Sequence, residues 1–294
     1  MPYALTIKPG TKVDLSDYPT DATSGLTKQA GKDQLKPLKD EIRDLQSLMY
    51  AASQNSLLIV LQGMDTSGKD GTVSSVLESV NPLGCRVWPF KTPTPLELSH
   101  DFLWRIHAKV PERGMMTVFN RSHYEDVLIV RVKDLVPRKV WSKRYNQINE
   151  FEELLTESGT IILKFFLHIS KEEQRERLLA REQDPEKAWK LSAGDWVERQ
   201  YWNQYQRAYE EALTKCSTKV APWNIIPADH KWYRDLAVAQ CIVDALTPYK
   251  KGWLKSLEAL GRVQKAEIET IREREKAAKS VDRDREPAPV KATS

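Results

Sequence analysis

The chain has 294 residues, of which 40% are hydrophobic and 29% are charged, a composition typical of a globular protein with a buried core. This length suits one large α/β domain or two small ones. The formal net charge of +4 is too small to indicate nucleic-acid binding by itself. It fits either a surface that carries both signs of charge or a protein with one local basic site for a polyanion.

Three features lead us to expect a reduced, cytoplasmic protein. No apolar run approaches the ~20 residues that a membrane-spanning helix needs. Residues 1–10 (MPYALTIKPG) lack the basic and apolar regions of a signal peptide. Cys85, Cys216 and Cys241 are too few and too widely spaced for a disulfide framework or a zinc site.

Strands and helices alternate along the expected fold. Its elements, in chain order, are an irregular arm over 1–32, a helix over 33–52, a strand over 56–62, a glycine-bearing turn over 63–71, a helix over 72–80, a strand over 85–90, a helix over 96–107, a strand over 115–119, a helix over 139–155, a strand over 160–169, helices over 171–183 and 195–213, a strand over 223–226 and a helix over 232–246. This alternation predicts an α/β fold with a parallel sheet covered by helices on both faces. The segment 251–294 is highly charged, and we expect it to be a disordered tail.

The segment 63–69 (GMDTSGK) predicts a phosphate-binding loop. It follows an expected strand and precedes an expected helix, which is the context that a GxxxxGK motif requires. Glycines let backbone N–H groups turn toward phosphate oxygens, while the helix N-terminus and Lys69 add positive charge. We expect Lys69 to be catalytic and the neighbouring residues to bind the phosphates of the ligand, namely Gly63, Met64, Thr66, Ser67, Gly68, Asp70, Gly71 and Thr72.

Two departures from the usual motif concern the metal ion. Asp70 follows Lys69 where the motif usually has the Ser or Thr that binds magnesium, and the nearest hydroxyl is that of Thr72. Asp65 lies inside the loop, where a carboxylate repels phosphate unless a divalent cation lies between them or the carboxylate deprotonates an acceptor phosphate. We therefore expect Asp65 to bind Mg²⁺, to handle a proton, or both. The alternative is that Asp65 only caps the turn.

The expected strand over 115–119 leads into a second polar motif that begins with Asn120 and Arg121. Arg121 would point from the carboxyl end of its strand into the crevice where α/β sheets bind ligands, and a guanidinium there can bind phosphate bidentately. A structural ion pair with Glu125, four residues on, is the alternative. His123 could act as a general base, but we favour a structural role for a lone histidine near a helix start.

The helix over 171–183 is rich in basic residues. Arg177 and Arg181 are four residues apart and share one face of this helix. Nucleotide kinases often use such a segment as a mobile lid that brings arginines over the phosphates and expels water. We expect a lid over about 175–200, although a solvated charged face would give the same pattern.

Several segments together resemble the second family of polyphosphate kinases. They are GMDTSGKDGT, FKTPTPLEL, FLWRIHAKVP, VFNRSHYEDVLIVRV, INEFEELL, the run over 159–181, WKLSAGDW and APWNIIPADHKWYR. The resemblance runs from about residue 35 to about residue 246 and is far more specific than the loop alone. The form FNRSHYEDVL looks most like the class III branch, which phosphorylates both nucleoside monophosphates and nucleoside diphosphates.

The resemblance implies a thymidylate-kinase-like P-loop domain over 33–250 with a helical lid, Mg²⁺ as cofactor and a homo-oligomer, either dimer or tetramer. Position by position, Asp65 and Lys69 match the loop aspartate and lysine of the family. Arg121 matches its strand-end arginine, and Arg181 matches its lid arginine. Asn120 and Glu125 fall in the stretch that tunes the choice of acceptor, and some branches have an aspartate in place of Asn120.

The expected function is reversible in-line transfer of phosphate from inorganic polyphosphate to AMP and ADP, giving ADP and ATP, with other nucleotides as further acceptors. Because polyphosphate is charged along its whole length, it needs a basic track. Candidates for this track or for the nucleotide site are Lys91, Arg131, Lys231 and Arg234.

Two other functions fit part of the sequence. The first is an ATP-dependent nucleoside monophosphate kinase, which would bind two nucleotides and work without polyphosphate. The second is a non-catalytic sensor of nucleotides or polyanions, which would bind without turnover. The joint presence of Asp65, Lys69, Arg121 and Arg181 argues against the sensor.

Overall fold

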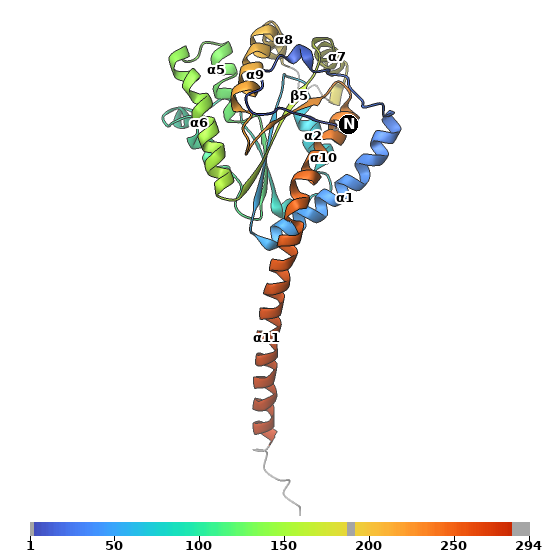
Figure 1. The fold of residues 1–294 in the computed structure, drawn as a ribbon, viewed down its shortest axis with the longest axis vertical. Coiled ribbons are helices and arrows are strands. Elements are labelled where there is room, and N and C mark those ends of the chain that lie inside the picture. Colours follow the sequence, from blue (N-terminus) through green and yellow to red (C-terminus); the bar gives the residue numbers. More distant parts are fainter. Residues whose placement is uncertain (1–2, 187–191, 284–294) are drawn as a thin grey trace, which may run out of the picture. The chain divides into compact units, whose positions relative to one another are not determined.

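A six-stranded sheet forms the centre of the part of the chain that the computed structural model describes, residues 3–186 and 192–283 (Figure 1). The strand order is β1-β6-β5-β2-β4-β3, in which β2 to β6 pair in parallel and β1 pairs antiparallel with β6 at one edge. The strands are β1 Leu5–Thr6, β2 Ser56–Gln62, β3 Cys85–Pro89, β4 Met116–Asn120, β5 Thr160–His168 and β6 Trp223–Pro227. The expected fold class, a parallel sheet flanked by helices, is confirmed.

Helices lie on both faces of the sheet (Figure 1). Helices α1, α2 and α10 pack together on one face, and α6 packs with α9 on the other. The α-helices up to residue 246 are α1 Lys28–Ala52, α2 Lys69–Val76, α3 Pro95–Leu98, α4 Trp104–His107, α5 Ile129–Val132, α6 Arg138–Glu157, α7 Lys171–Glu182, α8 Ala193–Arg199, α9 Trp202–Cys216 and α10 Lys231–Leu246.

The central strand β2 determines where the polar loops meet. All its residues are buried, because it lies between β4 and β5 and is covered by helices on both faces. Leu61 near its end lies opposite Asn120 of β4, and Gln62 lies opposite Phe166 of β5. The loops that follow these three parallel strands therefore emerge at the same edge of the sheet, where ligands of α/β proteins bind.

The N-terminal arm is more ordered than the sequence predicted. Strand β1 pairs with β6, and the backbone N–H of Ile7 donates to the carbonyl oxygen of Trp223 at 2.8 Å. Helix α1 begins at Lys28 rather than at residue 33, because the side chain of Thr27 accepts a hydrogen bond from the backbone N–H of Ala30 and caps the helix.

Two expected helices are each divided into two shorter helices. The segment 96–107 contains α3 and α4, since the carboxylate of Asp101 accepts from the backbone N–H of Leu103 and starts a new turn there. The segment 195–213 contains parts of α8 and α9, which are separated by Gln200 and Tyr201. Helical periodicity continues across both breaks, so the sequence pattern did not reveal them.

The expectation of a disordered C-terminal segment was wrong for residues up to 283. The described chain divides into a unit that ends at Lys250 and a unit that begins at Lys251, and helix α11 extends over Lys250–Arg283. This stretch has no proline before Pro287 and is rich in Ala, Leu, Glu, Lys and Arg, which are strong helix formers. High charge predicted disorder, but intrinsic helix propensity decided the conformation.

Candidate active site

The loop from Gly63 to Gly68, here called the glycine-rich loop, turns the chain from strand β2 into helix α2. Gly63 and Gly68 have φ values of +152° and +100°, in the left-handed region that favours glycine. A Cβ atom at Gly63 would lie 2.7 Å from the carbonyl oxygen of Leu167. A Cβ atom at Gly68 would lie 1.9 Å from Nη1 of Arg234. The loop therefore requires glycine at both ends, for its backbone angles and for the close approach of its neighbours.

Two hydroxyl groups in the glycine-rich loop are buried without an intramolecular partner. The Oγ1 atom of Thr66 and the Oγ atom of Ser67 make no hydrogen bond to any residue that the structure describes. Gly68 follows them and precedes helix α2, which begins at Lys69, and no side chain caps the N-terminus of this helix. Buried polar groups are nearly always satisfied in folded proteins. These hydroxyls and the helix N-terminus thus form a site suited to the oxygens of a bound phosphate.

Lys69 places its ammonium group inside the glycine-rich loop. The side chain is buried, and Nζ donates to the carbonyl oxygens of Gly63 at 2.8 Å and Met64 at 3.2 Å. Burial, together with the nearby guanidinium of Arg121, lowers the pKa of Lys69 to about 8. An anion bound beside Nζ would favour the charged form of the lysine.

Arg121 binds the carboxylate of Asp65 across the site. Its Nη2 atom lies 2.6 Å from Oδ1 of Asp65, and its backbone has a φ of +62° while its N–H donates to the carbonyl oxygen of Leu61. Burial alone would lower the pKa of Arg121, but the charges of Glu125 and Asp65 raise it above its ordinary value. The direct partner of Arg121 is therefore Asp65, while Glu125 acts on it through its nearby charge.

Arg181 reaches the same region from helix α7. Its Nη1 atom lies 3.1 Å from Oδ2 of Asp195 at the start of α8. Burial, and then the negative charge of Asp65, raise the pKa of Asp195. The expected lid segment over about 175–200 includes this ion pair, but its residues 187–191 lie outside the described part of the chain.

A family model described as Polyphosphate kinase 2 (PPK2) matches residues 25–252. The chain belongs to the polyphosphate kinase 2 family. A relative in Meiothermus ruber named AMP/ADP-polyphosphate phosphotransferase is 50% identical over 242 residues, which are 82% of this chain and 91% of the relative.

Further relatives of this polyphosphate kinase 2 chain agree with the assignment. The ADP-polyphosphate phosphotransferase of Rhodopseudomonas palustris is 44% identical over 85% of this chain and 91% of its own length. The crystal structure of polyphosphate kinase 2 from Arthrobacter aurescens TC1 superimposes with a TM-score of 0.79 at 46% identity. That match covers 81% of this chain and 87% of the crystal structure's chain.

Arg177 binds the backbone of the glycine-rich loop, a role that the sequence did not predict. Its guanidinium donates to the carbonyl oxygens of Thr66 at 3.0 Å and Ser67 at 3.1 Å. It also donates to the carbonyl oxygens of Ala228 at 2.6 Å and Asp229 at 2.9 Å. Arg177 and Arg181 share a helix face as expected, but Arg177 is buried and binds the backbone, whereas Arg181 binds a side chain near the site.

Three other expected ligand-binding residues make contacts around the glycine-rich loop. Asn120 donates from Nδ2 to Oδ1 of Asp70 at 2.7 Å, which ties the end of β4 to the start of α2. Arg234 lies against Gly68 and would be 3.3 Å from a Cβ atom at Gly71. The hydroxyl of Thr72 donates to the carbonyl oxygen of Gly68 at 3.1 Å, within the first turn of α2.

Arg131 and Lys231 make contacts away from the glycine-rich loop. Arg131 on α5 forms an ion pair with Glu211 of α9 and donates to the hydroxyl of Tyr145. None of these partners belongs to the loop, and the expectation that Arg131 binds polyphosphate or the nucleotide stays a prediction. Lys231 begins helix α10 and faces a groove beside α1.

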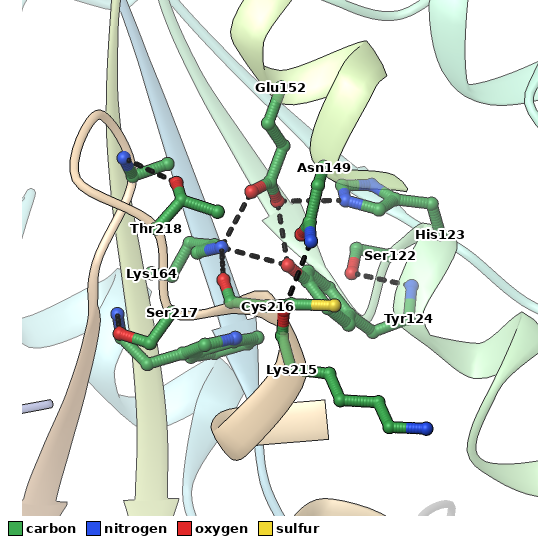
Figure 2. Close-up of polar contacts among 12 residues, drawn as sticks. Ser122, His123, Tyr124, Asn149, Glu152, Lys164, Lys215, Cys216, Ser217 and Thr218 are labelled. Atoms are coloured by element: carbon green, nitrogen blue, oxygen red, sulfur yellow. Dashed lines mark hydrogen bonds and ion pairs between the residues drawn. The ribbon is translucent and has the colours of Figure 1, made fainter. Parts of the chain in front are cut away.

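A buried polar network anchors the segment that follows Arg121 (Figure 2). The hydroxyl of Tyr124 donates to Oε1 of Glu152 at 2.8 Å, and Nε2 of His123 lies 3.2 Å from the same oxygen. The ammonium of Lys164 contacts both Tyr124 and Glu152, and all four side chains are fully buried. Burial alone would raise the pKa of Glu152, but Lys164 and His123 lower it. His123 is thus a structural residue that helps to fix the turn carrying Arg121.

Lys69 gives a prediction for the pH dependence of ligand binding. Its lowered pKa of about 8 means that the ammonium is charged below this pH and loses its proton as the pH rises through it. We expect the affinity advantage of the wild-type protein over Lys69→Met for tripolyphosphate to be largest below pH 8 and to shrink above it. Isothermal titration calorimetry of both proteins across this range measures the difference in affinity. Because tripolyphosphate changes its own charge with pH in the same way in both measurements, that effect cancels in the comparison. An advantage that stays constant would contradict the assigned role.

Arg177 gives a prediction for stability. We expect Arg177→Gln to lower the free energy of unfolding by about 3 kcal/mol, because buried backbone carbonyl groups lose charge-assisted hydrogen bonds. Arg175, which is exposed on the same helix, provides the matched control Arg175→Gln, with an expected change within about 0.5 kcal/mol. Urea denaturation of the two variants measures both values, and equal stabilities would refute the role of Arg177.

Proposed function

We propose that this chain transfers a phosphoryl group from inorganic polyphosphate to AMP and ADP, giving ADP and ATP, in a reversible reaction. The observation that carries the proposal is that the ammonium of Lys69, the ion pair of Asp65 with Arg121 and two buried hydroxyls that have no partner among the described residues all lie in the glycine-rich loop or contact it. The name of the Meiothermus ruber relative, which is 50% identical, gives independent support for both acceptors.

The mechanism follows from the charges around the glycine-rich loop. An oxygen of the terminal phosphate of AMP or ADP attacks the terminal phosphorus of polyphosphate, and the shortened chain leaves with the electron pair of the broken P–O bond. Lys69, Arg121 and Arg181 spread the negative charge of the transferring group. Asp65 orients the acceptor phosphate and accepts its proton where one is present. Catalysis then consists mainly of positioning and electrostatic stabilisation.

We propose Mg²⁺ as the cofactor, with Asp65 as its protein ligand. Among the described residues, no three His, Cys, Asp or Glu side chains come together as an all-protein metal site. Magnesium in phosphoryl-transfer enzymes is usually held by one or two carboxylates and by substrate phosphates. The carboxylate of Asp65 belongs to the same loop as the buried hydroxyls of Thr66 and Ser67, and it fits this requirement. When bound, the ion neutralises charge on phosphate oxygens.

The choice between acceptors concerns the segment that contains Asn120 and Glu125. Two relatives of similar identity carry different names, one for AMP and ADP and the other for ADP alone. Asn120 is bound to Asp70, and the charge of Glu125 acts on Lys69 and Arg121. Small changes in this segment therefore alter the charge and the space that an acceptor phosphate meets, and we propose that they set the acceptor range.

The proposal extends to the state of the protein in the cell. We propose a cytoplasmic homo-oligomer, dimer or tetramer, as the family resemblance of the sequence implies. None of the helices in the described residues is long and apolar enough to cross a bilayer.

The first experiment is nucleotide synthesis from AMP, and separately from ADP, with long-chain polyphosphate and Mg²⁺ and without ATP. We expect ADP and ATP from the first acceptor and ATP from the second. Lys69→Ala should lower turnover by at least about 100-fold, since it removes a charge that stabilises the transition state. The exposed Lys139 provides the control Lys139→Ala, which should retain full turnover.

Three results would change the assignment. Near-normal turnover by a folded Lys69→Ala protein would refute the role of Lys69. Product from ADP alone would restrict the acceptor range to diphosphates. Phosphorylation of AMP by ATP, with none from polyphosphate, would identify a nucleoside monophosphate kinase instead.

A further inference from the structure

A groove lies between the first half of helix α1 and the start of helix α10. Its volume is about 660 Å³. Ser75 of α2 and Asp235 of α10 also line it. Asp235 forms an ion pair with Arg234, whose guanidinium lies against Gly68 of the glycine-rich loop. The groove is therefore adjacent to the proposed active site. Its cationic residues, which give it the name lysine groove, are Lys28, Lys32, Lys36, Lys39 and Lys231.

The lysines of α1 form one continuous row. Lys28, Lys32, Lys36 and Lys39 are separated by four, four and three residues, so they share a helix face. At the rise of an α-helix, the row is about 16 Å long. Gly31 lets α1 pack closely on α10, because a Cβ atom there would lie 2.3 Å from the ring of Trp232. The row of lysines thus lines a groove between two closely packed helices, and it differs in this from a charged helix face that contacts only solvent.

The acidic residues of the lysine groove do not neutralise most of this row. Glu78 pairs with Lys39 at 2.8 Å. Asp235 pairs with Arg234 at 2.7 Å. Asp229 accepts from the hydroxyl of Thr20 at 2.6 Å and from the backbone N–H of Ser170 at 2.8 Å.

Positive charge therefore remains in the groove. Within the described part of the chain, Lys28, Lys32 and Lys36 take part in no ion pair. The N-terminus of α10 at Lys231 has no side-chain cap, so its backbone N–H groups add to the positive potential. A groove with several uncompensated cations attracts an extended polyanion.

We propose that the lysine groove binds the distal part of the polyphosphate donor, the phosphates that lie beyond the one being transferred. This inference rests on the proposed function. The three lysines without an ion pair, Lys28, Lys32 and Lys36, span about 12 Å along α1, which suits a ligand that carries a charge at every repeat. A mononucleotide carries at most three phosphates and ends in an uncharged ribose and base, so it does not match the whole row. The groove thereby favours long donors over short ones without taking part in the chemistry.

The test is the triple variant Lys28→Gln, Lys32→Gln and Lys36→Gln. All three side chains are exposed, so the fold should be retained, and thermal unfolding checks this. We expect the KM for long-chain polyphosphate to rise about tenfold, with a much smaller rise for tripolyphosphate, because only the long chain reaches the groove. The dependence of KM on salt concentration should also weaken, since fewer cations contact the polyanion.

A matched control removes the same charge elsewhere. Lys139 and Lys143 of α6 and Lys219 are exposed, and α6 covers the opposite face of the sheet (Figure 1). The triple variant Lys139→Gln, Lys143→Gln and Lys219→Gln should leave the KM for long-chain polyphosphate unchanged. An equal rise in both triple variants would mean that only net charge matters and would overturn the proposal.

Other outcomes also decide the question. Equal rises for long-chain polyphosphate and tripolyphosphate, a rise in the KM for AMP or ADP alone, or no change in any KM would each overturn the proposal. If the wild-type protein does not turn over polyphosphate, the proposed function fails. Calorimetric binding of long-chain polyphosphate to the wild-type protein and to the Lys28, Lys32 and Lys36 variant then tests the groove separately. Equal affinities in that measurement would reject it.

Discussion

The active site depends on how Arg177 holds the backbone of the glycine-rich loop. Its guanidinium binds the carbonyl oxygens of Thr66 and Ser67 on one side of the loop. Because the N–H and C=O groups of a trans peptide point in opposite directions, fixing the carbonyls fixes the direction of the amides. The loop can then present N–H groups, the unpaired hydroxyls and Lys69 to a phosphate. An arginine from a distant helix thereby completes a structure that the loop residues alone do not stabilise.

The cations of the site are balanced by carboxylates. Arg121 binds Asp65, Arg181 binds Asp195, and the charge of Glu125 acts on both Lys69 and Arg121. This balance lets several cations lie close together in a partly buried region, where unpaired charges are costly. In the proposed mechanism, a phosphate that enters the site competes with the carboxylates for the same guanidinium groups. Binding of substrate would then be coupled to rearrangement of these ion pairs.

Rigidity around Arg121 comes from the core of the protein. The turn that carries Arg121 is followed by His123 and Tyr124, which are bound to Glu152 and Lys164 (Figure 2). A buried network of this kind is highly directional, since every member loses a partner if the turn moves. The lysine groove differs from this network, because the side chains of Lys28, Lys32 and Lys36 are exposed to solvent and form no ion pair among the described residues. Precise geometry suits the reacting phosphates, whereas a row of long flexible cations suits a repeating polyanion.

Much of the fold and part of the site were predictable from local patterns. The buried strands at 56–62 and 160–169 are continuous apolar runs, and the glycine-rich loop follows the first of them directly. Local patterns also placed Arg121 at the end of a parallel strand, as its place after β4 bears out. Helix α11 was missed because its high charge predicted disorder, although its residues are strong helix formers. The breaks between α3 and α4 and between α8 and α9 were missed because helical periodicity continues across them.

The sequence by itself therefore determined the α/β class, the loop and the residue types that handle phosphate, since all of these depend on neighbours in the chain. Only the tertiary structure decided which partner each charge has. Arg177 lies more than a hundred residues from Thr66, and the two meet because α7 lies against the glycine-rich loop. The packing of α5 against α9 pairs Arg131 with Glu211. Among the described residues, Lys28, Lys32 and Lys36 of α1 form no ion pair. Ion pairs between segments that are distant in the sequence depend on how the chain folds, so the order of charged residues along the chain does not predict them.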